Sequence, residues 1–191
     1  VLCSKKYEQG SCRGVYRYTL EDWEQSTNRL CFEVVKEDKM EYVKFDMHCH
    51  TSEGSVDSAV KVKEFAAELK KKGFGGMLIT DHDSYGGYRA YRDDPDKIKD
   101  FVVLRGIEYD TFEYGHFLVV LPEDAPESMF KLLEHRGLSL FNLIRLVHGC
   151  GGVLGPAHPC GEKFLSFLST RKSFVTLYKW YIKFLDFLEG Y

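Results

Sequence analysis

The chain has 191 residues, of which 44% are hydrophobic, and a formal net charge of −3. This length and apolar content suffice for one globular domain with a sizeable core, and the acidic balance argues against a basic nucleic-acid surface, apart from the positive charge that bound divalent cations would add. No apolar run approaches the roughly 18 residues of a membrane span and no signal-peptide pattern opens the chain, so we expect a cytoplasmic protein without membrane association.

Residues 1–42 are expected to form a small N-terminal extension without catalytic groups. Val15–Leu20 and Leu30–Lys36 are predicted strands that could form a β-hairpin. The six cysteines of the chain contain no Cys-x-x-Cys pair and match no common zinc spacing, so free thiols are favoured over a disulfide framework or a zinc site. The main domain is then expected over residues 43–191.

The stretch Val43–His50 alternates apolar and polar residues and is predicted to be a strand. Because side chains on a strand alternate between its two faces, Asp46, His48 and His50 share one face. A metal ion would satisfy both imidazoles without further partners. Asp46 lies farther back and is placed to accept from an imidazole and fix its tautomer. The alternative is a surface strand whose polar face is hydrated.

Beyond this strand, predicted strands and helices alternate. A first helix is expected to begin at a cap formed by Ser55 or Asp57, to run to about Lys72, and to end at Gly73. Two later helices are expected at Glu127–His135 and Leu140–His148. Further strands are expected at Gly76–Thr80, Phe101–Leu104, Phe117–Leu121, Gly152–Leu154 and Phe184–Leu188. Repeated strand–helix units indicate an α/β fold with a parallel sheet covered by helices.

Residues with metal-binding side chains fall where these strands end, namely His48, His50, His82, Glu108 and His158. The carboxyl ends of strands in a parallel barrel gather at one face, so the sequence predicts a single shared metal site. A mixture of imidazole and carboxylate ligands suits Zn, Mn or Fe better than Mg or Ca. His135 and His148 end helices instead and are predicted to be structural.

The motifs, in this order, resemble the PHP (polymerase and histidinol phosphatase) superfamily, particularly its small stand-alone metal-dependent phosphoesterases. The resemblance runs from about Val43 to the C-terminus and is carried by Phe45–Ser52, Thr80–Asp83, Gly106–Glu108 and Ala157–Pro159. It implies a distorted (β/α)7 TIM-like barrel that holds two or three divalent ions, usually Mn, Zn or Fe. It also implies hydrolysis of a phosphate ester, such as a nucleotide, an oligonucleotide end or a small phosphorylated metabolite.

The resemblance also implies a set of metal ligands, with Glu108 bridging two ions: His48, His50, His82, Glu108, His116 and His158. The family places an acidic ligand after the first motif. Asp57 has the preferred spacing here, Glu53 is the alternative, and a helix cap is the other interpretation of Asp57. The family's late Asp-x-His motif is missing, and the sequence does not begin with Met. We therefore expect either a barrel that is incomplete at its C-terminus because residues are missing, or a truncated paralogue.

Two ions about 3.5–4 Å apart would hold the attacking and leaving oxygens of a phosphoester, with a metal-activated water as the nucleophile. Asp81 and Asp83 flank His82 and are candidate catalytic residues that orient it or accept a proton; loop solvation is the alternative. Gly86 and Gly87 could bring backbone amides to a substrate phosphate, and Arg89 could bind it. The alternatives are an ordinary turn for the two glycines and a solvated helix face for Arg89.

The leading hypothesis is therefore a metal-dependent phosphoesterase that acts on a phosphorylated small molecule or a nucleotide, with no protein partner indicated. A non-catalytic PHP-like metal-binding or regulatory module is the second hypothesis, and it predicts metal-dependent stability without hydrolysis. The third is a metal-dependent hydrolase that cleaves a C–N bond.

Overall fold

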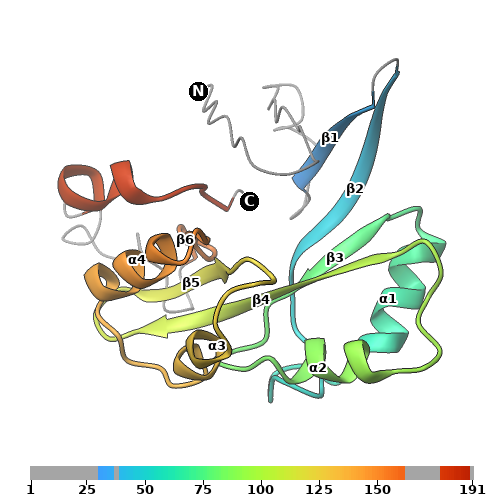
Figure 1. Ribbon diagram of the computed structural model, residues 1–191, viewed down its shortest axis with the longest axis horizontal. Helices are drawn as coiled ribbons and strands as arrows, with labels where there is room; N and C mark the ends of the chain where they lie inside the picture. Colours follow the sequence, from blue (N-terminus) through green and yellow to red (C-terminus); the bar gives the residue numbers. More distant parts are fainter. Residues whose placement is uncertain (1–29, 37–38, 162–176, 190–191) are drawn as a thin grey trace.

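The computed structural model describes residues 30–36, 39–161 and 177–189 (Figure 1). Within them, six strands form one sheet in the order in which they follow along the chain. The strands are β1 (Leu30–Lys36), β2 (Lys39–Cys49), β3 (Gly76–Ile79), β4 (Val102–Thr111), β5 (Gly115–Val120) and β6 (Val153–Pro156). The predicted strand at Val15–Leu20 lies outside the described residues.

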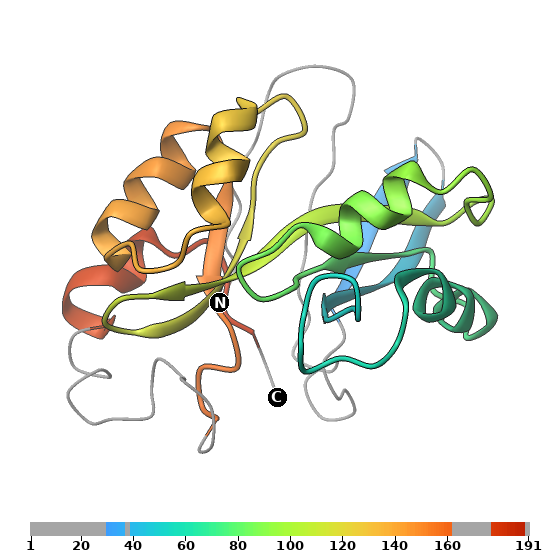
Figure 2. The ribbon, with the colours of Figure 1, turned by 90° about the horizontal axis from the view of Figure 1, so that it is seen from below.

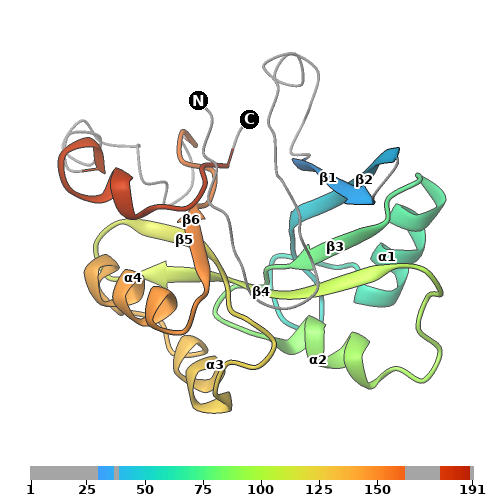
Figure 3. The same ribbon diagram turned by 45° about the horizontal axis from the view of Figure 1, so that its top comes forward.

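The sheet is mixed, so the expected parallel sheet is confirmed only for its middle. β2, β3 and β4 are parallel neighbours, whereas β1 pairs antiparallel with β2, and β5 pairs antiparallel with both β4 and β6. β5 turns back because only three residues separate it from β4, too few for the crossover that a parallel pair requires. Figure 3 shows the resulting curled sheet, with β4 crossing from one half to the other.

Within the described ranges, four α-helices lie against the sheet, and Figure 2 shows α1 and α2 over one half and α3 and α4 over the other. Their bounds are α1 (Val62–Lys71), α2 (Gly86–Asp93), α3 (Glu127–Leu133) and α4 (Leu140–Gly149). Helix α4 buries Leu140, Leu143, Ile144 and Val147, the spacing of an amphipathic helix that packs one stripe onto a core. Each helix pair therefore covers its own apolar cluster.

The first helix begins later than the sequence suggested. It starts at Val62, whose backbone N–H donates to the carboxylate of Glu53, 3.1 Å from Oε2. An acidic group suits this position because the exposed amides of a helix start carry partial positive charge. Glu53 thus holds the helix start, neither Ser55 nor Asp57 caps it, and Gly73 ends it in the left-handed region with φ 81°.

Strand β4 is longer than predicted and carries both the core and the polar centre. Ile107 and Tyr109 are fully buried in the apolar cluster under α3 and α4. Glu108 lies between them, so the pleat turns it toward the opposite face. The prediction that Glu108 stands at a strand end is wrong, because pairing with β5 extends β4 to Thr111.

The C-terminal end of the described chain is not a strand. A π-helix at Leu177–Tyr181 and a 3₁₀-helix at Ile182–Phe184 precede an extended stretch that ends at Glu189. This stretch lies beside β6, since the N–H of Asp186 donates to the carbonyl of Leu154 at 3.0 Å.

None of the helices in the described ranges has the length and apolarity that a membrane crossing requires.

Candidate metal centre

A buried carboxylate forms the middle of the histidine cluster. Glu108 has 0% exposed surface, and its two oxygens face different groups of imidazoles. Oε2 lies 3.1 Å from Nε2 of His48, 3.1 Å from Nε2 of His50 and 3.4 Å from Nδ1 of His82. Oε1 lies 3.1 Å from Nδ1 of His116 and 2.8 Å from Nε2 of His158. The carboxylate therefore joins two sets of imidazoles, one at each oxygen.

The sheet brings these side chains together from five separate stretches of chain. His48 and His50 lie at the end of β2, where the pairing with β3 shifts register between Asp46 and Cys49. His82 follows β3 and forms an isolated bridge with Glu108. His116 is the second residue of β5, and His158 follows β6 with φ 31°. The strands and the segments directly after them therefore determine where these side chains meet.

The nitrogens of His48 and His50 that face away from Glu108 are also held. Nδ1 of His48 lies 2.8 Å from Oε1 of Glu189, and Nδ1 of His50 lies 3.3 Å from Oγ of Ser55. A hydrogen bond at one ring nitrogen fixes which nitrogen remains as a ligand. Both rings consequently present Nε2 to Glu108.

Asp57 lies at the more exposed side of the cluster, with its Oδ2 3.1 Å from Nε2 of His82. Among the residues that the structure describes, three overlapping sets of side chains could hold a metal ion, and within each set the ligand atoms lie within 4.8 Å of one another. They are His48 with His50 and Glu108; His50 with Asp57 and His82; and His82 with Glu108 and His116. Of the two acidic candidates after the first motif, the structure places Asp57 beside His82, whereas Glu53 is engaged at the helix start.

The electrostatics of the centre favour positive charge. Burial alone would raise the pKa of Glu108, but hydrogen bonds from His116, His158, His48 and His50 hold that pKa far below its usual range. Burial would likewise lower the pKa of His48, yet hydrogen bonds with Glu108 and Glu189 outweigh it and raise the pKa to about 10. The centre therefore binds a proton strongly, at the place where a cation would sit.

The donor set fits divalent cations. Nδ1 of His116 is buried and faces Oε1 of Glu108 at 3.1 Å. Nε2 of His48 and Nε2 of His50 lie 3.1 Å apart, both beside one carboxylate oxygen. Ring nitrogens that converge on the same carboxylate compete for it, and a metal ion would satisfy them together. Imidazole with carboxylate suits Zn, Mn or Fe.

The two aspartates that flank His82 make bonds of a different kind from those expected of catalytic groups. Asp81 is fully buried; its Oδ1 accepts from the N–H of Thr51 at 2.6 Å and its Oδ2 from the N–H of Gly87 at 3.0 Å. Asp83 donates its N–H to the carbonyl of Glu108 and accepts from the N–H of Asp110, each at 3.0 Å. These bonds orient the loop that carries His82. None of them supports the proton-accepting role that the sequence suggested for the two aspartates.

The residues expected to bind substrate phosphate have partners within the chain. The N–H of Gly87 donates to Asp81, and that of Gly86 donates to Oγ of Ser84 at 3.0 Å. A Cβ on Gly87 would lie 2.1 Å from Oγ1 of Thr51, so this glycine allows close approach of the chain rather than of a ligand. Arg89 pairs with Glu134 at 2.7 Å. These contacts give no support to the phosphate-binding interpretation of Gly86, Gly87 and Arg89, which stays a prediction.

We expect Asp81→Asn to destabilise the fold. The substitution replaces one buried acceptor oxygen by a donor that faces the N–H of Thr51 or Gly87, and an unsatisfied buried donor costs about 1–3 kcal/mol. Urea unfolding of the variant and of Asp96→Asn, whose side chain is 84% exposed, measures the difference. An unfolding free energy equal to that of the unmodified protein would show that Asp81 has no structural role.

A model of the PHP domain matches residues 46–181. The chain belongs to the PHP domain family. Two solved structures share the fold: a lesion-specific endonuclease from Pyrococcus furiosus, at 16% identity and a TM-score of 0.59, and Endonuclease Q in complex with a 27-mer duplex that carries an abasic lesion, at 17% identity and a TM-score of 0.59. Each comparison covers 76% of this chain and 41% and 42% of the respective endonuclease. No curated protein matches.

The PHP assignment confirms the resemblance that the motifs suggested, and the shared fold confirms the α/β class. This PHP domain spans about two fifths of the length of the two endonucleases. Two residues at its centre were missed from the sequence, Ser55 and Glu189. Ser55 is close to His50 in sequence and was considered only as a helix cap, whereas Glu189 is 141 residues from His48, so no local pattern indicates it.

Proposed function

We propose that this PHP domain hydrolyses phosphate esters with two divalent ions held on either side of Glu108. The observation that carries the proposal is the division of imidazoles between the two oxygens of this buried carboxylate. His48, His50 and His82, with Asp57, would hold one ion beside Oε2. His116 and His158 would hold another beside Oε1.

The chain supplies the ligands and their orientation. Ions bound in such a centre supply a water of lowered pKa and neutralise charge on the phosphate. Glu189 and Ser55 orient His48 and His50, and Asp81 and Asp83 hold the loop that carries His82. With a metal-activated water as the nucleophile, no side-chain nucleophile is needed.

The finer expectations belong to the same proposal: Mn, Zn or Fe as the metal, a distorted (β/α)7 barrel, and a cytoplasmic location. For the substrate, the net charge of −3 favours a small phosphorylated molecule or nucleotide over a long polyanion. The two solved structures of similar fold are endonucleases, one of them bound to a lesion-containing duplex. An oligonucleotide phosphodiester is therefore included among the substrates to test.

We expect hydrolysis of p-nitrophenyl phosphate, bis-p-nitrophenyl phosphate or a short oligonucleotide when Mn²⁺ is added, and loss of that turnover in His50→Ala. The loss should exceed the roughly 10- to 100-fold that follows removal of a group behind a ligand. His135→Ala, an exposed histidine at the end of α3, is the matched control and should keep full turnover. Inactivity of the unmodified chain across Mn²⁺, Zn²⁺ and Fe²⁺ with all three substrates would contradict the proposal.

A further inference from the structure

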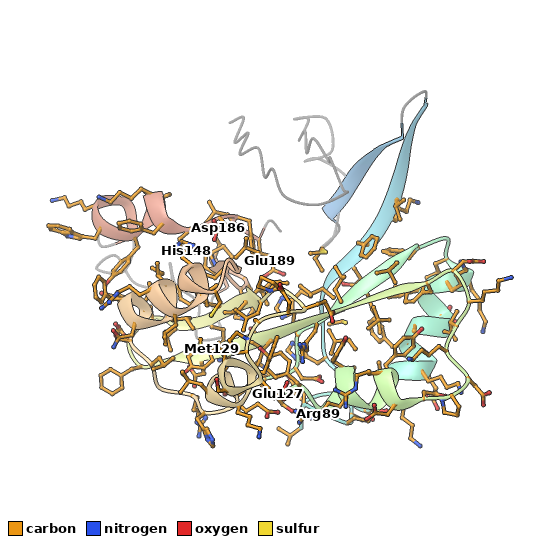
Figure 4. The ribbon with its side chains drawn as sticks, viewed as in Figure 1. Arg89, Glu127, Met129, His148, Asp186 and Glu189 are labelled. Atoms are coloured by element: carbon orange, nitrogen blue, oxygen red, sulfur yellow. The ribbon has the colours of Figure 1, made fainter. Side chains whose placement is uncertain are left out.

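The C-terminal stretch Leu185–Glu189 is fixed along β6 by one carboxylate. The N–H of Asp186 donates to the carbonyl of Leu154, and the N–H of Leu154 donates to Oδ2 of Asp186, each at 3.0 Å. The same Oδ2 lies 2.9 Å from Nε2 of His148 on α4. Figure 4 shows Asp186 and His148 side by side, with Glu189 further toward the middle of the molecule. The stretch is thus anchored to both a strand and a helix.

A glycine in β6 allows this stretch to lie directly on the sheet. A Cβ on Gly155 would come within 2.4 Å of the carbonyl oxygen of Phe187 and within 2.5 Å of its ring. Contacts this short exclude any larger residue unless the stretch moves away. Phe187 lies between Asp186 and Glu189 in sequence, so the anchor and the close approach set where Glu189 can reach.

Glu189 uses both carboxylate oxygens at the metal centre. Oε1 lies 2.8 Å from Nδ1 of His48, and Oε2 accepts from the backbone N–H of His158. The Glu189 side chain is 11% exposed. One carboxylate therefore joins the ends of β2 and β6, which carry ligands on opposite sides of Glu108.

The contact atoms distinguish a positioning group from a metal ligand. Glu189 bonds Nδ1 of His48, whereas Nε2 of the same ring faces Glu108. A carboxylate behind an imidazole fixes the ring and its tautomer and increases its strength as a ligand. Its other oxygen is occupied by a backbone amide, and Glu189 is in none of the three sets of possible ligands found in the described chain.

We propose that Glu189 is a positioning residue of the metal centre: it holds His48 with Nε2 directed at the metal and ties the His158 loop to β2. The inference rests on the proposed function in that the centre binds metal. It adds that the C-terminal stretch completes the centre from behind its ligands. A chain in which this stretch cannot dock should bind metal weakly even though every ligand side chain is present.

The test uses Mn²⁺ alone as the probe, with affinity measured by competition against a chelating dye. We expect Glu189→Ala to weaken binding about 10- to 100-fold. The Mn²⁺ affinity of Glu189→Gln should lie between those of the unmodified chain and Glu189→Ala, because the Gln carbonyl oxygen can accept from His48 while its amide nitrogen faces the N–H of His158. Glu68→Ala removes a carboxylate that is 56% exposed on α1 and should bind Mn²⁺ as the unmodified chain does.

A second measurement reads the position of the ring directly. In ¹⁵N NMR of the chelator-treated protein, the Nδ1–H of His48 should donate to Glu189, and Glu189→Ala should shift that nitrogen signal while circular dichroism remains unchanged. Wild-type Mn²⁺ affinity together with an unchanged His48 signal in Glu189→Ala would overturn the inference. Glu189-dependent Mn²⁺ binding without hydrolysis of any phosphate ester would contradict the proposed function alone.

Discussion

Replacing Glu108 with Gln is expected to remove metal binding and hydrolysis together. Gln keeps the size of the side chain but carries no negative charge, and its amide nitrogen would face either His116 and His158 or the other three imidazoles. Because the carboxylate touches both sets of ligands, both ions should be affected by this one substitution. The loss of Mn²⁺ affinity should exceed the 10- to 100-fold expected for a group behind a ligand.

The measurement is Mn²⁺ stoichiometry and affinity, followed by turnover at saturating Mn²⁺. Glu134→Gln is the control, because Glu134 is a partly buried carboxylate that is ion-paired with Arg89 but lies outside the centre. Its variant should keep both ions. A Glu108→Gln protein that still binds two ions would show that the carboxylate does not bridge them.

The same substitution should change the proton affinity of the chelator-treated centre. Hydrogen bonding and charge from Glu108 are the main influences that raise the pKa of His48 to about 10 against the opposing effect of burial. Without them the pKa of His48 should fall, although Glu189 still favours the protonated ring. NMR titration of His48 follows this change independently of any activity.

The parts of the centre that could be predicted from sequence are those that short stretches of neighbouring residues determine. The alternation of Val43–His50 places His48 and His50 on one face without any knowledge of neighbours. The preference for Asp57 over Glu53 came from family spacing, and the structure places Asp57 beside His82 and Glu53 at a helix start. The ligand types also sufficed to suggest the class of metal.

What could not be predicted depends on contacts between distant segments. Glu108 was expected at a strand end, but pairing with β5 continues β4 beyond it, and a single sequence does not reveal that pairing. The glycines after His82 have the composition of a phosphate-binding loop, yet Asp81 and Thr51 occupy the space around Gly87. Glu189 contacts His48 across 141 residues of sequence, so no local pattern identifies it as part of the centre.

For the helices and strands, the sequence predicted several bounds but not which strands pair. Leu30–Lys36 is a strand with the expected bounds, and α3 and α4 begin where Pro126 and Leu140 indicated. Strand Leu30–Lys36 nevertheless pairs with β2, which runs across the expected boundary at residues 42 and 43. The division into an extension and a domain stays a prediction.

Metal binding is expected to tighten as pH rises from about 6.5 toward 8.5. His48 must lose its proton to act as a ligand, and its pKa of about 10 means that the proton is present across this range. Displacing one proton makes affinity rise about tenfold per pH unit, or roughly 100-fold over the interval. Competition titrations with Mn²⁺ at several pH values, and calorimetry in two buffers with different ionisation enthalpies, measure the affinity and the proton released.

The stability of the chelator-treated protein should change in the opposite direction over the same range. The folded-state pKa of His48 is raised above its ordinary value of 6.5, so its contribution is complete below pH 6.5 and is lost as pH rises through about 10. The pKa of Glu108 is lowered instead, so its contribution to the stability of the fold is lost only toward acid pH and is complete above its ordinary pKa of 4.5. Unfolding free energy should therefore fall between pH 6.5 and 10 without metal, by on the order of a few kcal/mol, and much less with Mn²⁺ bound. Parallel pH profiles with and without Mn²⁺ would show that His48 does not couple the proton to the metal.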